Sequence, residues 1–189
     1  MLLFRPMKNS LPRFSRPAKI EVTGELAQRL ERFQPTLIFE NFAEVDGSKN
    51  QILLYQRETA FRKYDPIVFQ LEEFCHYRIW EDGSECLREN MGYAYAGDLL
   101  PGGKIQGGKN SRPGQRMRRQ YVFKRHLLLD FQYLEFQVTV CLDVISLRTQ
   151  TESLGYREIE KKLNHFLDFL DAVQAGIPLF ENTKKEAVP

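Results

Sequence analysis

The sequence predicts an α+β protein: an antiparallel β-meander or partly closed barrel, with a short N-terminal helix and a long amphipathic C-terminal helix. Three observations predict this class. Runs of β-forming residues alternate with short turn signals at regular spacing. Residues 136–144 alternate apolar and polar side chains, as a half-buried strand does. Apolar residues recur at helical spacing between residues 159 and 173.

The chain begins with a basic, proline-containing stretch, residues 1–19, that holds no acidic residue and is predicted to be an extended arm. After it, Thr23 has the side chain of an N-cap residue, and apolar residues then follow at helical spacing. Pro35 ends this short helix. The single predicted α+β domain therefore begins near residue 20 and runs to residue 180.

The centre of the sequence predicts two successive β-hairpins. Asp46-Gly47-Ser48 and Asp82-Gly83-Ser84 are turn signals, and each is flanked by runs rich in β-branched and aromatic residues. Each run is expected to pair antiparallel with the run that follows the turn. The predicted strands are 36–45, 51–61, 67–80 and 86–95.

Residues 97–117 predict a basic, glycine-rich loop, because this stretch combines repeated glycines with two prolines and has no acidic residue after Asp98. Strand character resumes at residue 118. The alternating strand 136–144 should then offer its apolar face to the C-terminal helix, which Gly176 and Pro178 end. Residues 181–189 are predicted to be a polar tail.

Positive charge is concentrated in two acid-free stretches. Residues 1–19 and the segment between Asp98 and Asp130 together hold 13 of the 27 Lys and Arg residues. The remaining 14 basic residues stand against all 25 acidic ones, so the rest of the chain has a net charge of −11. The total of +2 thus conceals two cationic segments on an anionic body. This asymmetry predicts an anionic partner, either nucleic acid or an acidic protein surface.

The segment 118–125 carries the most informative pattern. In an extended strand, Arg119, Tyr121, Phe123 and Arg125 share one face, where aromatic rings can stack bases and guanidinium groups can neutralise phosphates. The alternative is that the two aromatic residues belong to the core and the arginines extend from the sheet edge. The candidate nucleic-acid-binding residues are Lys104, Lys109, Arg112, Arg116, Arg118, Arg119, Tyr121, Phe123, Lys124 and Arg125.

No strong catalytic or metal-binding motif occurs in the sequence. The stretch 103–110 has the spacing of a phosphate-binding P-loop, but Asn110 stands where Ser or Thr should hold Mg²⁺, and Pro113 opposes the helix that must follow. The spacing of Cys75, His76 and Cys86 matches no common zinc pattern. We therefore predict no cofactor and no metal site.

One group of residues keeps an enzymatic alternative open. Asp130, Glu135 and Gln137 follow the basic segment, and some nucleases place an acid and then Glu-x-Gln on a strand. In one regular strand, however, Asp130 and Glu135 face opposite sides, so a bulge or turn would be needed to bring them together.

The leading hypothesis is a non-enzymatic binding and assembly protein whose basic arms engage nucleic acid in a nucleoprotein complex. A structural subunit of a virus- or phage-like particle is the main alternative, with basic arms docked on a neighbour's acidic residues between 72 and 89. A small-ligand barrel and a nuclease-like enzyme are further alternatives. Three cysteines indicate a reducing, cytoplasmic setting, and no apolar run is long enough to suggest a membrane partner.

Overall fold

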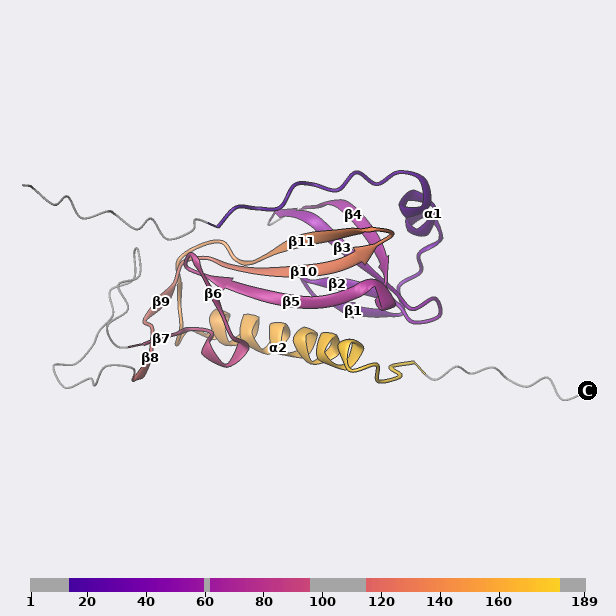
Figure 1. The fold of residues 1–189 in the computed structure, drawn as a ribbon. Coiled ribbons are helices and arrows are strands. Elements are labelled where there is room, and N and C mark those ends of the chain that lie inside the picture. Colours follow the sequence, from indigo (N-terminus) through magenta and orange to yellow (C-terminus); the bar gives the residue numbers. More distant parts are fainter. Residues whose placement is uncertain (1–13, 60–61, 96–114, 181–189) are drawn as a thin grey trace, which may run out of the picture.

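The computed structural model describes residues 14–59, 62–95 and 115–180, with the backbone alone for residues 57–59. Within these residues, two four-stranded and two smaller antiparallel sheets with two α-helices confirm the predicted α+β class (Figure 1). In the described residues the strands form separate sheets and no closed barrel. Neither described helix is both long and apolar enough to cross a lipid bilayer.

The first sheet is the predicted meander, with strand order β1-β2-β3-β4. The run predicted as one strand, 36–45, is divided into two strands at Asn41, whose φ of 71° turns the chain back on itself. Val45, Ile52, Ile67 and Phe69 are fully buried on the inner face. The four strands are β1 (Leu37–Phe39), β2 (Ala43–Asp46), β3 (Gln51–Thr59) and β4 (Arg62–Gln70).

The predicted strand 67–80 is divided as well, because the 3-10 turn η1 (Leu71–Glu73) carries the chain from the first sheet into the second. The second sheet has the order β11-β10-β5-β6, so the late strand β10 lies beside β5. A bulge between Arg125 and His126 shifts the register of β10 against β11. The strands are β5 (Phe74–Glu81), β6 (Ser84–Cys86), β10 (Arg125–Tyr133) and β11 (Phe136–Ile145).

The predicted return strand 86–95 is wrong for most of its length. Only Ser84–Cys86 pairs with β5 after the Asp82-Gly83 turn, in which both residues have positive φ. The chain then forms the 3-10 turn η2 (Arg88–Asn90) and leaves the sheet. Two small two-stranded sheets follow, built from β7 (Tyr93–Tyr95) with β8 (Arg116–Arg118), and from β9 (Tyr121–Val122) with β12 (Thr149–Gln150).

Both predicted helices form. The first is α1 (Gly24–Arg32), which lies against β4, and the second is α2 (Leu154–Gln174). Ser153 caps α2 by accepting a hydrogen bond from the Tyr156 amide at 3.2 Å. The helix ends before Gly176, whose φ is 67°.

The apolar stripe of α2 is buried as predicted, but its main neighbour is β5 rather than β11 (Figure 1). Phe166 is fully buried and its ring lies 5.1 Å from that of Phe39 and 5.5 Å from that of Phe42. Of the predicted apolar face of β11, Val140 and Leu142 join this core, whereas Phe136 is 68% exposed. Side chains from both large sheets and α2 thus share one core.

Candidate functional site

The strands β7 and β8 form the two sides of a hairpin, and the glycine-rich segment connects them in the sequence. They run antiparallel with Tyr95 opposite Arg116, so residues 96–115 connect two adjacent positions. This hairpin lies at the end of the molecule away from α1 (Figure 1). Residues 96–114 lie outside the described ranges, and with them the P-loop-like stretch and three of the ten candidate residues: Lys104, Lys109 and Arg112.

A buried charge cluster lies next to this hairpin. Arg125 of β10 faces Glu81 of β5, and both side chains are fully buried. The Arg125 Nε donates to Glu81 Oε2 at 2.7 Å, and its terminal nitrogens donate to the Tyr156 hydroxyl at 2.9 Å and to Glu160. Burial alone would lower the pKa of Arg125, but the negative charges of Glu81 and Glu160 raise it. The guanidinium is therefore charged and neutralised inside the molecule.

Arg119 extends the cluster to the turn after β5. Its Nη1 donates to Glu81 Oε1 at 3.1 Å and to Asp82 Oδ2 at 3.2 Å. The other Asp82 oxygen accepts the amides of Phe123 and Lys124, each at 2.9 Å. Because the Asp82 carboxylate accepts hydrogen bonds from these two backbone amides, residues 118–125 do not form the single extended strand that the sequence predicted. Instead the chain divides into β8, β9 and the start of β10.

Gly92 closes the cluster at the foot of β7. Its amide donates to Glu81 Oε1 at 2.9 Å, and its carbonyl accepts the Arg119 amide at 2.9 Å. A Cβ atom at this position would lie 2.3 Å from the Tyr156 hydroxyl, and the φ of 69° is itself unfavourable for other residues. The buried charges thus hold the hairpin against β5 and α2 through a contact that only glycine permits.

The arginines on the hairpin itself lie beside aromatic rings, and the Arg118 guanidinium is 5.9 Å from the centre of the Tyr156 ring. Arg116 and Arg118 are exposed, and their guanidinium groups lie 4.4 Å and 5.8 Å from the centre of the Tyr93 ring. Arg118 also donates to the Thr151 carbonyl at 3.0 Å. These distances are those of cation–π contacts.

A second arginine–aromatic group lies beside the first. The pairing of β9 with β12 places Tyr121 opposite Gln150, and the exposed Arg148 covers the Tyr121 ring at 3.8 Å. Phe123 is also near Arg148, with its ring centre 6.0 Å from the guanidinium. Sequence reasoning missed both Tyr93 and Arg148, because neither belongs to the basic segment.

Ion pairing divides the candidate arginines into two sets. Arg119 and Arg125 are paired inside the molecule. In the described part of the chain, four exposed cations near the hairpin form no ion pair with a carboxylate. Together with the three neighbouring rings, we call these cations the arginine–tyrosine surface: Arg116, Arg118, Lys124, Arg148, Tyr93, Tyr121 and Phe123.

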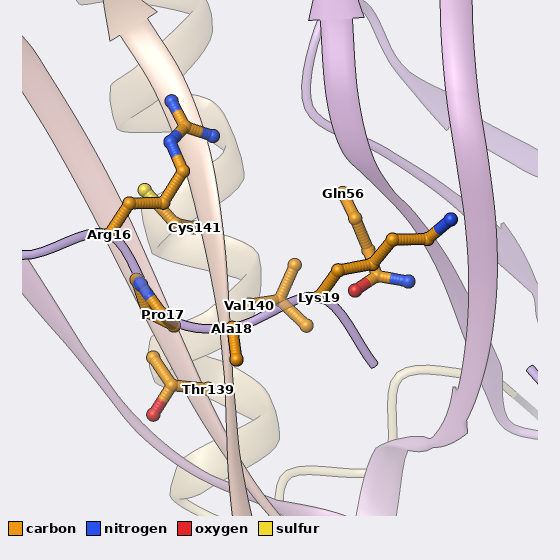
Figure 2. Close-up of a pocket in the computed structure, with 8 residues that line it drawn as sticks. All are labelled: Arg16, Pro17, Ala18, Lys19, Gln56, Thr139, Val140 and Cys141. Atoms are coloured by element: carbon orange, nitrogen blue, oxygen red, sulfur yellow. The ribbon is translucent and has the colours of Figure 1, made fainter. Parts of the chain in front are cut away.

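The described part of the N-terminal arm lies along the side of the molecule opposite α2 (Figure 1). Its two cations are paired with the same chain: Arg16 with Asp143, and Lys19 with Asp65 at 2.8 Å. The Ile20 amide donates to Gln56 Oε1 at 2.7 Å. A pocket of about 50 Å³ lies beneath this segment. Figure 2 shows the residues that line it: Arg16, Pro17, Ala18, Lys19, Gln56, Thr139, Val140 and Cys141.

Beside this pocket, His126, Cys141 and Asp143 bring their donor atoms within 4.8 Å of one another. The His126 Nδ1 lies 2.8 Å from Asp143 Oδ1, and this contact, with that of Arg16, lowers the pKa of Asp143 to about 2. Burial raises the pKa of the Cys141 thiol to about 11. A thiol with that pKa is protonated near neutral pH, so this trio lacks the activated thiolate of a nucleophilic enzyme.

The nuclease-like group is not assembled by the fold. Asp130 is 1% exposed and accepts hydrogen bonds from Arg78 Nε at 2.9 Å and from Thr139. Its hydrogen-bond partners thus come from neighbouring strands, whereas Glu135 lies exposed in the turn between β10 and β11.

A second pocket, of about 270 Å³, lies near the C-terminal end of α2 and is not enclosed by the sheets.

The acidic residues between 72 and 89 do not form one solvent-facing rim. Glu81 and Asp82 hold the internal arginines, and Glu73 pairs with Arg29 of α1 at 2.7 Å. The exposed carboxylates of this stretch are Glu72, Glu85 and Glu89.

Compared with protein families, with curated proteins and with solved structures, the chain matches none.

Proposed function

We propose that this chain is a non-enzymatic binding and assembly protein whose arginine–tyrosine surface engages nucleic acid within a nucleoprotein complex. The observation that carries the proposal is the contrast between the two sets of arginines. Arg119 and Arg125 are neutralised internally, whereas Arg116, Arg118 and Arg148 lie exposed on aromatic rings without a carboxylate partner among the described residues. Positive charge that the fold leaves uncompensated is available to an external anion.

The geometry suits a ligand that offers both phosphates and flat bases. A guanidinium that lies on a tyrosine ring is held in one plane, so it loses little freedom when a base stacks on its outer face. The same group can donate to a phosphate oxygen at its edge. Arg148 over Tyr121 and Arg116 over Tyr93 provide two such positions.

The segment that connects β7 and β8 adds to this proposal through its composition. It contributes Lys104, Lys109 and Arg112 and no acidic residue after Asp98, and it connects the paired residues Tyr95 and Arg116. We expect these cations to extend the phosphate contacts of the surface. The anionic remainder of the chain would repel nucleic acid elsewhere and so orient it.

The test is a titration of the full chain with generic single- and double-stranded nucleic acid at several salt concentrations. The triple variant Arg116→Ala, Arg118→Ala, Arg148→Ala should bind more weakly and with a shallower salt dependence. Each lost phosphate contact removes about 0.7 from the slope of log K against log salt for single strands, or about 0.9 for duplex.

The matched control is Arg32→Ala, which removes one exposed arginine at the C-terminal end of α1, far from the hairpin (Figure 1). This variant should bind like the wild type. Equal binding by the triple variant, or no binding by the wild type, would refute the assignment of the surface.

A structural subunit remains the second candidate, and one observation favours it. Leu147 is 78% exposed and Leu154 is 79% exposed, and they flank β12 next to Arg148. Large apolar side chains beside arginine and tyrosine are typical of protein interfaces. Light scattering of the nucleic-acid-free chain would detect such assembly, and Leu147→Ser with Leu154→Ser should abolish it. The free thiols of Cys75, Cys86 and Cys141 fit a cytoplasmic particle in either case.

A further inference from the structure

Three potential metal ligands share the outer face of β10 and β11. His126 pairs with Asp143 across the ladder, and Cys141 lies two residues before Asp143, so all three side chains are on the same side of the sheet. Their donor atoms lie within 4.8 Å of one another. Two paired strands hold them, which fixes the backbone positions before any ligand arrives.

The chemistry of these donors is specific. A thiolate, an imidazole and a carboxylate are the three ligand types that zinc takes in proteins, and a set of three leaves one position for water. Hard cations such as Mg²⁺ and Ca²⁺ prefer oxygen alone. Cys141 is 6% exposed and lines the pocket beneath residues 16–19.

The site already holds one positive charge. Arg16 pairs with the Asp143 carboxylate, and Phe14 stacks on the His126 ring with 4.3 Å between ring centres and 6° between planes. Residues 14–22 belong to no helix or strand. Moving residues 14–22 away from the outer face of β10 and β11 therefore breaks side-chain contacts but leaves the hydrogen bonds between strands intact.

We propose that His126, Cys141 and Asp143 bind a divalent metal of the Zn²⁺ class in competition with Arg16. On binding, the Cys141 thiol loses its proton to solvent and its sulfur coordinates the metal together with an imidazole nitrogen of His126 and a carboxylate oxygen of Asp143. Arg16 leaves the carboxylate. Linkage then requires that metal weaken the docking of residues 14–16 by the same factor that Arg16 weakens metal binding.

The experiment titrates the reduced full chain with Co²⁺, a spectroscopic substitute for Zn²⁺, and then displaces it with Zn²⁺. The wild type should develop a sulfur-to-cobalt charge-transfer band that saturates at one metal per chain and disappears with Zn²⁺. Cys141→Ser should abolish the band, and Asp143→Asn should weaken binding at least about tenfold. The control Cys86→Ser, which removes a thiol at the other edge of the sheet, should keep the band.

Arg16→Gln tests the competition separately. Without the guanidinium, the affinity for Co²⁺ should rise at least about fivefold, within the usual range of coupling between two sites. Circular dichroism confirms that each variant is folded. A band that persists in Cys141→Ser, or a wild type that develops none at millimolar Co²⁺, would overturn the site. An unchanged affinity in Arg16→Gln would overturn the competition with Arg16.

Discussion

Glu81→Gln should lower the free energy of unfolding by about 3–5 kcal/mol, because it removes the fully buried carboxylate that pairs with the fully buried Arg125. The substitution keeps the size of the side chain, so the loss reports charge rather than packing. Glu81 also accepts hydrogen bonds from Gly92 and Arg119, which lose a charged acceptor at the same time. Urea denaturation of the wild type and the variant gives the difference directly.

Glu85→Gln provides the matched control, because Glu85 is an exposed carboxylate on β6, close to Glu81 in the same sheet. Its replacement should change the free energy of unfolding by no more than about 0.5 kcal/mol. If Glu81→Gln lowers the free energy of unfolding no more than Glu85→Gln does, the Arg125–Glu81 pair is not the buried anchor of the hairpin that we describe.

Gly92→Ala should lower the free energy of unfolding by about 2–4 kcal/mol. Part of this is the left-handed backbone, at about 1–2 kcal/mol for a residue with a Cβ, and the rest is the collision of that Cβ with the Tyr156 hydroxyl at 2.3 Å. Tyr156→Phe removes the hydroxyl and should therefore recover part of the loss in the double variant. Thermal or urea unfolding of the four proteins in this cycle measures the coupling.

Gly176→Ala separates the cost of the left-handed backbone from the cost of the collision with Tyr156. Gly176 has a φ of 67°, close to the 69° of Gly92, but nothing lies within 4 Å of its added Cβ. This variant should show only the backbone cost, about 1 kcal/mol. A loss for Gly92→Ala no larger than that for Gly176→Ala would mean that Tyr156 moves aside without cost.

The sequence predicted the elements whose signals are local. The alternating residues of β11, the stripe of α2 and the turns at Asp46 and Asp82 each occupy neighbouring positions in the chain. The breaks at Asn41 and at η1 were missed, because nothing in the β-forming runs 36–45 and 67–80 marks the places where the chain changes direction. Register and sheet order depend on contacts between distant segments, which periodicity does not encode.

The ion pairs of the arginines likewise depend on contacts between distant segments, which local sequence patterns do not predict. Arg119 and Arg125 lie in an acid-free stretch, yet the β5–β10 register brings Arg125 opposite Glu81, which is 44 residues away in sequence. A low local density of acids therefore did not imply a free cation. Arg148 reaches Tyr121 only because two-residue strands pair, and His126 reaches Asp143 only across a ladder with a bulge. None of these proximities has a sequence signature.

The direct pairing of Tyr95 with Arg116 also bears on how this chain can be engineered and how it can diverge. Because the connection between them starts and finishes at adjoining points, halving its length changes the closure entropy by only about 0.6 kcal/mol. Foreign peptides, tags or shortened turns are thus expected to graft there while the remaining scaffold keeps its melting temperature. The hairpin base is a natural insertion point, at which recognition can be rewritten independently of folding.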